Sequence, residues 1–294
     1  MTRILLLGSR GQVGWELRRT LATIGEVTGL DRREVDLADN DSLVAAVDAV
    51  KPAIVVNAAA YTTVDKAESD EQTAMAVNGV APGVIAEAAK RHHALMVHYS
   101  TDYVFDGVKS DAYVETDAPN PLNAYGRTKL AGERAVEAVG GRYLILRTSW
   151  VYGMHGANFL LTMLRLARER KELRVVDDQT GAPTWSRAIA EATAQILAQG
   201  RGRGAREWEA ASGIYHLTCM GSTTWYGFAR AILERTLTAT PVSQPAVIPI
   251  SSAEYPTAAV RPKNSILSNE KLEREFGLRL GRWSDCLALC MEQP

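Results

Sequence analysis

The stretch ILLLGSRGQVGWEL, residues 4–17, decides the fold. Its first four residues are apolar and strand-like, and three glycines with GxxGxxG spacing follow before a helical pattern begins. Glycine lets the backbone turn tightly and approach a phosphate group, while the positive end of the following helix attracts that anion. The strand-turn-helix context therefore predicts a nucleotide-binding loop. Its expected contacts are Gly8, Gly11, Gln12, Val13 and Gly14.

The alternation of strand and helix patterns continues through the first half of the chain. The expected strands are Ile4–Leu7, Val27–Leu30, Ile54–Asn57, Leu95–Tyr99 and Leu144–Arg147. The expected helices are Trp15–Ile24, Ser42–Val50, Thr73–His92 and Tyr125–Val139. Repeated βα units imply a parallel sheet with helices on both faces. We predict an α/β fold with a doubly wound parallel sheet of Rossmann type, whose ligand lies beyond the carboxyl ends of the strands.

Beyond residue 150 the pattern loosens, which predicts a smaller C-terminal lobe that binds the substrate. Further helices are expected at Asn158–Arg170, before Leu197 and at Trp225–Leu237, with strands near Leu173–Val176 and at Tyr215–Thr218. A glycine-rich segment at 200–204 is expected to separate units, and a proline-rich stretch runs from Pro241 to Pro262. We predict a dinucleotide-binding domain over residues 1–150, to which parts of 184–218 return, and the lobe over 151–294.

The composition is that of a globular protein. The 294 residues are 46% hydrophobic and 23% charged with a net charge of −1, which excludes disordered and fibrous classes and disfavours nucleic-acid binding. No apolar run has membrane length. The chain starts directly with a strand pattern and no basic leader, so we expect a cytoplasmic protein. Its three cysteines cannot all pair, and the helical spacing of Cys286 and Cys290 favours buried thiols over a metal site.

Charged residues follow the second expected strand, where the adenosine ribose of a nicotinamide cofactor would lie. Asp31 favours NADH because an acidic side chain there holds the ribose hydroxyls, whereas Arg32 or Arg33 could pair with the extra phosphate of NADPH. We therefore expect both cofactors to be accepted. Asp36, followed by Leu37, would place a carboxylate near the adenine amino group, or would instead cap the next helix. Both interpretations stay open.

Tyr125 and Lys129 lie four residues apart, on one face of an expected helix. A free phenol has a pKa near 10, and a nearby cation lowers it by favouring the phenolate. The tyrosine would donate its proton to a carbonyl oxygen as hydride arrives at the carbon, while the lysine also holds the nicotinamide ribose. Such a pair on a solvated helix would mean little without the glycine loop.

Thr101 ends the fourth expected strand, beside the cofactor loop and upstream of Tyr125. Its hydroxyl could donate to the substrate carbonyl, or simply cap a turn. We favour the catalytic role.

The assembled pattern closely resembles the dTDP-4-dehydrorhamnose reductase family of the extended short-chain dehydrogenase/reductase superfamily. The resemblance runs almost end to end. It is carried by GQVGWEL at 11–17, VNAAAYTTVDKAE at 56–68, HYSTDYVFDG at 98–107, PLNAYGRTKLAGE at 121–133, RTSWVYG at 147–153, DDQTGAPT at 177–184 and YPTAAVRPKNS at 255–265.

The resemblance implies reduction of the 4-keto group of dTDP-6-deoxy-L-lyxo-4-hexulose to dTDP-L-rhamnose, a precursor of bacterial surface polysaccharides, with NADPH or NADH. It implies a catalytic trio of Thr101, Tyr125 and Lys129. Asp102 and Trp150 match sugar-contacting positions of the family, and a flat indole suits the apolar face of a deoxysugar. The positions that match the lining of the cofactor site are Ala60, Tyr61, Thr62 and Tyr99, in addition to Tyr125 and Lys129.

Two further expectations concern the diphosphate and a metal. Arg261 is our candidate for the substrate diphosphate, because a guanidinium binds phosphate oxygens with two hydrogen bonds. Some family members bind magnesium at a dimer interface through carboxylates, one of which matches Glu16. We align its partner position with Arg187, a cation that would repel the metal. Magnesium is therefore disfavoured, and a homodimer is left open.

Other functions share parts of this pattern. A sugar-nucleotide 4,6-dehydratase needs a second carboxylate directly after the first, but here Asp102 is followed by Tyr103, so elimination lacks its base. An epimerase or another sugar-nucleotide 4-ketoreductase would share the motifs, and an epimerase consumes no added cofactor. A non-catalytic NADP-binding regulatory subunit of a synthetase is the alternative outside enzymes, and a co-purifying synthetase would reveal it.

Overall fold

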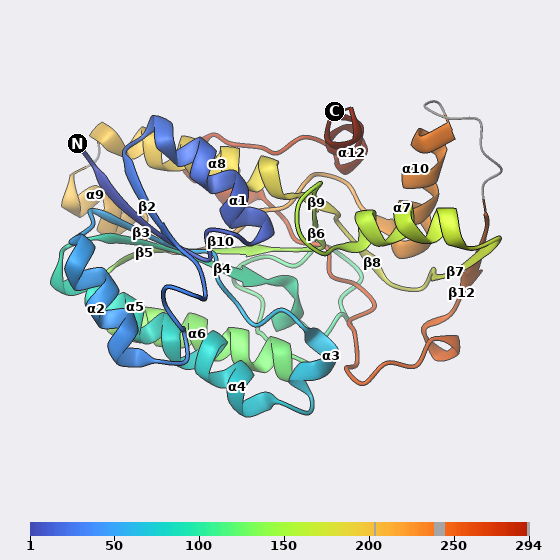
Figure 1. The fold of residues 1–294 in the computed structure, drawn as a ribbon, viewed down its shortest axis with the longest axis horizontal. Helices are drawn as coiled ribbons and strands as arrows, with labels where there is room; N and C mark the ends of the chain where they lie inside the picture. The colour runs from blue at the N-terminus through green and yellow to red at the C-terminus, as the bar shows by residue number, and fades with distance from the viewer. Residues whose placement is uncertain (203, 238–244, 293–294) are drawn as a thin grey trace.

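A computed structural model describes residues 1–202, 204–237 and 245–292 of the chain. Its centre is a six-stranded parallel sheet with the strand order β10-β5-β4-β3-β1-β2 (Figure 1). The strands are β1 (Arg3–Leu7), β2 (Glu26–Leu30), β3 (Ile54–Asn57), β4 (Leu95–Thr101), β5 (Arg142–Thr148) and β10 (Gly213–His216). The order turns back between β1 and β3, which is the switch point where such sheets bind ligands. The predicted fold class is confirmed.

Helices cover both faces of this sheet (Figure 1). One face carries α1 (Gln12–Thr20), which continues into the 3-10 turn η1 (Leu21–Thr23), and α8 (Ser186–Gln199). The other face carries α2 (Asn40–Val50), α5 (Ala81–Arg91) and α6 (Ala124–Val139). Two short helices, α3 (Val64–Ala67) and α4 (Glu71–Met75), lie beside α6.

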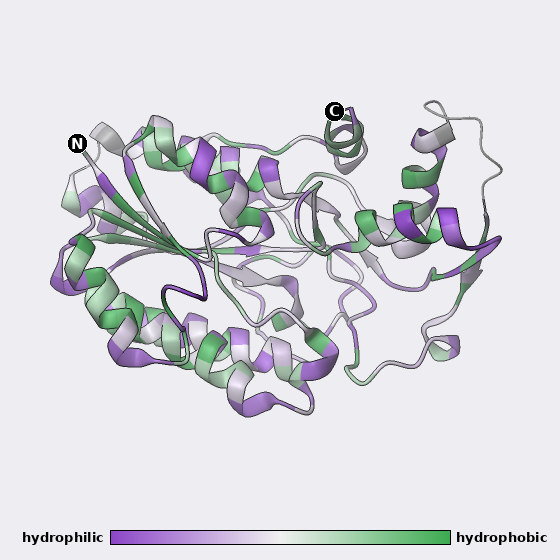
Figure 2. Ribbon diagram, viewed as in Figure 1, coloured by the Kyte–Doolittle hydropathy of each residue, from purple (hydrophilic) through white to green (hydrophobic). Residues whose placement is uncertain are grey.

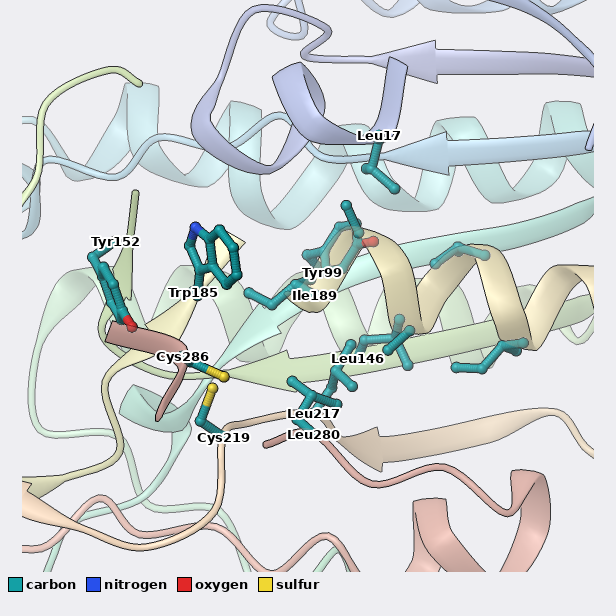
Figure 3. Close-up of a cluster of buried hydrophobic side chains, with 14 of the residues drawn as sticks. Leu17, Tyr99, Leu146, Tyr152, Trp185, Ile189, Leu217, Cys219, Leu280 and Cys286 are labelled. Atoms are coloured by element: carbon teal, nitrogen blue, oxygen red, sulfur yellow. The ribbon is translucent and has the colours of Figure 1, made fainter. Parts of the chain in front are cut away.

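Alternation along the strands builds two cores, one on each face of the sheet. In β1, Ile4 and Leu6 belong to the core under α1 and α8, whereas Leu5 and Leu7 belong to the core under α2 and α5. The central strands are accordingly almost uniformly hydrophobic (Figure 2). Burial on both sides is the expected environment of a parallel strand. Figure 3 shows the first core, where Tyr99 of β4 lies beside Ile189 of α8.

The second half of the chain contributes to both the main sheet and the smaller lobe. The lobe contains α7 (Phe159–Glu169), β7 (Glu172–Val176), α10 (Trp225–Leu237) and β12 (Ala246–Ile250), with β12 parallel to β7. By contrast, α8 packs on α1 and β10 pairs with β5, so this part of the chain returns to the main sheet. The turn η4 (Gly200–Gly202) and α9 (Ala205–Ala210), which contacts β5, stand where the glycine-rich segment was expected to separate units.

Short elements join the sheet and the lobe. The strands are β6 (Val151–Tyr152) with β9 (Thr184–Trp185), and β8 (Thr180–Gly181) with β11 (Thr223–Thr224). The remaining elements are η3 (Asp102–Val104), η5 (Ser252–Glu254), α11 (Glu270–Phe276) and α12 (Trp283–Met291). Of the proline-rich stretch, 241–244 lie outside the described residues and 246–250 form β12. Among the described residues, no helix is both long and apolar enough to cross a bilayer.

Two local expectations need correction. The helix expected over Thr73–His92 is interrupted by a π-helical turn, η2 (Ala76–Val80), between α4 and α5. The suggestion that Asp36 caps the next helix is wrong, because Asp39 caps α2 by accepting from the backbone N–H groups of Asp41 and Ser42. Asp36 instead accepts from the N–H of Ala38, which closes a tight turn.

Candidate active site

The glycine loop is built so that the backbone itself forms the binding surface. Gly8 has a φ of +77°, and a Cβ there would lie 2.7 Å from the backbone nitrogen of Ala59. A Cβ on Gly14 would lie 2.0 Å from the carbonyl oxygen of Gly8. Gly11 is the N-cap of α1 and makes no side-chain cap, so the first amides of the helix stay available for an anion. These glycines let the loop pack closely against itself and against the segment after β3, next to the open start of α1.

Gln12, predicted to touch the cofactor, also reaches the lobe. Its side-chain oxygen accepts from Nδ2 of Asn158 at 3.0 Å, and Asn158 is the N-cap of α7. Val13 packs against the core under α1.

Asp31 at the end of β2 is already held by two arginines. Nε of Arg10, from the glycine loop, lies 2.7 Å from Oδ2 of Asp31, and Arg33 donates to both carboxylate oxygens. Hydrogen bonds from Arg33 are the main reason that the pKa of Asp31 is lowered. Arg32 is exposed. Arg10 and Arg33 thus offset the negative charge of Asp31 where a ribose or its phosphate would bind. Arg10 was not among the residues predicted to bind the cofactor.

The loop after β3 contains Ala60, Tyr61 and Thr62 and is clamped by a residue that the sequence did not single out. Asn78, in η2, accepts from the backbone N–H of Tyr61 at 2.8 Å and donates to its carbonyl oxygen at 3.0 Å. It also donates to Oγ1 of Thr128 in α6. Asn78 therefore ties this loop to the helix that carries Tyr125. The Asn-Gly pair inside a helical pattern was the available signal, because it marks a break.

Tyr125 and Thr101 meet at the carboxyl end of β4. Asn123 caps α6 by accepting from the N–H of Gly126 at 2.8 Å, which fixes the start of the helix that presents Tyr125. Partial burial raises the pKa of Tyr125 to about 12, and a hydrogen bond with Thr101 opposes that rise. Thr101 also caps η3, since it accepts from the N–H of Tyr103 at 3.2 Å. Both interpretations of Thr101, the catalytic contact and the turn cap, are compatible with this geometry.

Asp102 continues this cluster. The hydroxyl of Thr101 donates to its Oδ1 at 2.9 Å, and its side chain is 2% exposed. Burial raises the pKa of Asp102 to about 7, against the opposing effect of hydrogen bonds from Ser265 and Thr101. Ser265 closes the RPKNS segment and was not predicted as part of the site.

Lys129 lies one helical turn after Tyr125 and is 2% exposed. Its Nζ donates to the carbonyl oxygen of Tyr99 at 2.6 Å and lies 3.4 Å from Nε2 of His98. Burial lowers the pKa of Lys129 to about 8, while Glu133 on the same helix acts in the opposite direction. Near neutral pH the ammonium form of Lys129 is thus only moderately favoured over the neutral amine.

The side chain of Tyr99 does not line the cofactor site. Its ring lies in the core (Figure 3), and its hydroxyl shares a 2.6 Å hydrogen bond with Oγ1 of Thr193 in α8. Only the backbone of Tyr99 faces Lys129. His98, which the sequence analysis passed over, is buried and bonded through Nδ1 to Nδ2 of Asn57 at 3.2 Å. A histidine in an otherwise apolar strand was its only sequence signal.

Trp150 lies two residues after the end of β5 and has a φ of +46°. Its indole is half-buried and stacks on Trp225 of the lobe, so it is neither an ordinary core residue nor a free surface residue. No sequence pattern pointed to Trp225.

Arg261 forms an ion pair with Asp65, which lies in α3, far from it in the sequence. Its Nη2 lies 2.7 Å from Oδ2 of Asp65 in α3, and Nη1 also contacts Asp65 and the carbonyl oxygen of Ala259. Nη1 also donates to Oγ1 of Thr257, and the side chain of Tyr103 interacts with the same guanidinium. The expected diphosphate contact would therefore compete with these partners.

Glu16 and Arg187 line one open hollow of about 490 Å³. Nε of Arg187 lies 2.8 Å from Oε1 of Glu191, which lines the same hollow. Glu16, Arg187 and a second carboxylate, Glu191, therefore line the same hollow. The three cysteines are free and buried.

A family model, curated sequences and a solved structure all match this chain over nearly its full length. A family model described as RmlD substrate binding domain matches residues 1–294. A dTDP-4-dehydrorhamnose reductase of Burkholderia thailandensis is 52% identical over 293 residues and covers 98% of each chain. That of Escherichia coli K12 is 44% identical over 285 residues, 95% of this chain and 94% of its own. A crystal structure of dTDP-4-dehydrorhamnose reductase from Bacillus anthracis in complex with NADP has a TM-score of 0.91, with 32% identity, 100% coverage of this chain and 99% of that one.

Proposed function

The chain belongs to the family described as RmlD substrate binding domain, and we propose that its site reduces a dTDP-linked 4-keto-6-deoxysugar as follows. The protein is an NAD(P)H-dependent oxidoreductase. It converts the 4-keto group of dTDP-6-deoxy-L-lyxo-4-hexulose into the hydroxyl group of dTDP-L-rhamnose. The cluster of Thr101 and Tyr125, with Lys129 one turn away, is the observation that carries the chemical part of this proposal.

The residues of the glycine loop fit a dinucleotide. The positions where a Cβ would collide, Gly8 and Gly14, leave a cradle of backbone, and the uncapped start of α1 offers N–H groups to the diphosphate. We propose that Asp31, Arg10 and the exposed Arg32 meet the adenosine ribose. The other proposed cofactor contacts are Gly11, Gln12, Val13, Asp36, Leu37, Ala60, Tyr61, Thr62, Tyr125, Lys129 and the backbone of Tyr99.

When bound, the reduced nicotinamide supplies a hydride to the carbonyl carbon. Tyr125 donates its phenolic proton to the carbonyl oxygen, which becomes the new hydroxyl group. With a pKa raised to about 12, the phenol is protonated at neutral pH and serves as the acid. The ammonium of Lys129 favours the phenolate that remains, and the hydroxyl of Thr101 donates to the same carbonyl oxygen.

The substrate contacts are proposed to come from both parts of the chain. Asp102 and Trp150 would hold the deoxysugar, and Arg261 the diphosphate. We propose that the lobe after residue 150 binds the substrate, while α8, α9 and β10 remain part of the dinucleotide-binding domain, because they pack on or pair with the main sheet.

Two properties of the whole protein are also proposed. Three free thiols suit a reducing compartment, which supports a cytoplasmic location. The hollow beside Glu16 contains Met154, which is 49% exposed, and a second copy of the chain would cover such an apolar side chain in a homodimer. Light scattering of the purified protein tests the dimer.

An assay of the purified protein tests the function. The dTDP-linked keto sugar should drive oxidation of NADPH and NADH in proportion to the dTDP-L-rhamnose formed. Interconversion of two sugar nucleotides that differ only in configuration at C4, without net cofactor consumption, would indicate an epimerase instead. An inactive protein with intact cofactor binding would indicate a regulatory subunit.

A further inference from the structure

Trp225 has no role in the site as described so far, although it lies directly against Trp150. The two indoles are nearly parallel, with an angle of 6° and ring centroids 3.6 Å apart. Phe159 contacts Trp225 in turn, with ring centroids 4.7 Å apart. We call these three residues the aromatic stack. Its members come from α7, α10 and the segment after β5.

Two features of Trp150 are locally unfavourable, its backbone conformation and its face-to-face contact with Trp225. Trp150 has a φ of +46°, which is rare for a bulky side chain. Aromatic pairs also prefer offset or edge-to-face contacts to a close face-to-face arrangement such as that of Trp150 and Trp225. Features of this kind persist only where the surrounding structure enforces them, and they concentrate at binding sites.

The surrounding structure that enforces the stack is the short strand pair β8 and β11. Thr223 pairs with Gly181 and Thr224 with Thr180, which fixes the start of α10, at Trp225, directly after the residue that pairs with Thr180. A Cβ on Gly181 would lie 2.5 Å from Cε2 of Trp150, so only glycine admits the indole at this distance.

The backbone around Trp150 is fixed to the segment that follows β8. Oγ of Ser149 donates to the carbonyl oxygen of Ala182 at 2.8 Å. The carbonyl oxygen of Trp150 accepts from the N–H of Thr184 at 3.2 Å. Both the plane and the position of the indole are thus determined from outside β5.

The same segment also reaches the cluster around Tyr125. A Cβ on Gly181 would lie 2.8 Å from Oγ of Ser265, whose N–H donates to the carbonyl oxygen of Thr180 at 2.9 Å. Ser265 in turn lies near enough to Asp102 to oppose the rise of its pKa. Gly181 therefore stands between the indole of Trp150 and the carboxyl group that contacts Thr101.

At its other end the stack is anchored beside the glycine loop. Phe159 follows Asn158, whose Nδ2 donates to Oε1 of Gln12. The stack therefore bridges the two parts of the protein between which the substrate must lie.

We propose that Trp225 is a positioning residue of the sugar subsite, which by covering one face of Trp150 leaves only the opposite face free for the deoxysugar. The proposal rests on the proposed function. Trp225 does not touch the reacting atoms, so its loss should weaken sugar binding and leave hydride and proton transfer in the bound complex almost unchanged.

The test compares Trp225→Ala, Trp225→Phe and Trp283→Phe with the wild-type enzyme. Trp283 is the matched control, because it lies in the same hydrophobic core and meets Phe228 edge-on at 6.1 Å, and its contacts do not include Trp150. The measurements are KM and kcat for the dTDP-linked keto sugar, Kd for NADPH, and the circular dichroism of the stacked indoles.

In Trp225→Ala we expect KM for the sugar nucleotide to rise about fivefold, the magnitude of one aromatic pair, with kcat within about twofold. Kd for NADPH should not change, which shows that the variant is folded. The dichroism of the indole pair should vanish. Trp225→Phe should recover most of the KM, and Trp283→Phe should behave like wild type in all the measurements.

An unchanged KM in Trp225→Ala, with the dichroism of the pair lost, would overturn the proposal. So would an equal rise in Trp283→Phe, because the effect would then be a general loosening of the core. A wild-type enzyme that does not turn over the keto sugar would instead overturn the proposed function, and this inference with it.

Discussion

Tyr125 is a stronger base once deprotonated than an exposed tyrosine, because burial raises its pKa to about 12. Because of this raised pKa, the phenol is protonated at neutral pH. The residue can therefore donate its proton without first having to take one up. In the proposed mechanism, the hydroxyl of Thr101, which opposes the rise of this pKa, and the charge of Lys129 favour release of the proton.

Tyr125→Phe should abolish turnover, with kcat reduced by at least about a hundredfold, because general acid catalysis contributes at least that much. Cofactor affinity should stay nearly intact, since the ring remains. Turnover and NADPH titrations check both. Near-normal turnover in this variant would mean that the proton comes from another group.

Deprotonation of Lys129 should limit activity at high pH. Burial lowers its pKa to about 8, so the fraction of ammonium falls as the pH rises through that value. We expect kcat to be constant below about pH 7 and to decline above about pH 8. The profile is measured with saturating cofactor, and thermal unfolding at each pH serves as the control. A kcat that stays constant to pH 10 would contradict the role of the ammonium.

The arginines around Asp31 should influence how well the protein binds NADPH compared with NADH. Since Arg10 and Arg33 already surround this carboxylate, the 2′-phosphate of NADPH would meet donors rather than an unpaired negative charge. Arg10→Ala should therefore raise KM for NADPH about tenfold, the value of one charged hydrogen bond, and change KM for NADH less than about twofold. Arg165→Ala on the exposed face of α7 is the control. Equal losses with both cofactors would show that Arg10 does not contact the 2′-phosphate.

At the scale of elements, the docking of α6 on β5 determines where Tyr125 and Lys129 lie. Arg147 of β5 and Glu133 of α6 form a buried pair with bonds of 2.6 and 2.9 Å, and both side chains are 1% exposed. Nη1 of Arg147 is buried with no hydrogen-bond partner among the described residues. Such a pair aligns the helix but stabilises it little in net terms.

Glu133→Leu should lower the free energy of unfolding by about 3–5 kcal/mol, because it leaves the guanidinium buried and unpaired. The double variant Glu133→Leu/Arg147→Met should recover most of this loss, since apolar residues replace both charges. Urea unfolding measures both values. A double variant as unstable as the single one would show that the pair itself provides the stability.

The elements that could be predicted from the sequence are those specified by local pattern. β3 occupies the predicted range Ile54–Asn57 because a short apolar run carries its own signal, and α10 likewise spans Trp225–Leu237. The Asn-Gly pair inside η2 signals a break in the helical pattern, but the π-helical form of that break could not be predicted, because a tertiary contact accompanies it. A Cβ on Gly132 of α6 would lie 2.1 Å from the carbonyl oxygen of Asn78, so close contact between the helices, rather than local preference, accompanies the bulge.

At the scale of the whole molecule, the contacts that complete the site join residues far apart in the chain. Trp225 stacks on Trp150, and Arg261 pairs with Asp65 at a separation of 196 residues. No periodicity or spacing encodes such pairs. The trio of Thr101, Tyr125 and Lys129 could be proposed because each member sits at a strand end or a helix start, whereas the partners supplied by the lobe become visible only in three dimensions.

The pair of Arg261 and Asp65 lies where the diphosphate of the substrate is proposed to bind. Asp65 also accepts from the N–H of Ala259, so it holds the loop as well as the guanidinium. If the guanidinium of Arg261 binds the diphosphate, Arg261→Gln should raise Kd for dTDP about tenfold and leave Kd for NADPH unchanged.

Asp65→Asn separates the two tasks of this carboxylate. The amide oxygen can still accept from Ala259 and Arg261, but the negative charge that offsets the guanidinium is gone. Kd for dTDP should therefore fall, by about threefold at low salt, and the gain should shrink as ionic strength screens the charges. Titrations of dTDP at two salt concentrations measure this. If both variants bind dTDP like wild type, Arg261 only fastens the loop to α3, and the diphosphate must be held by other groups.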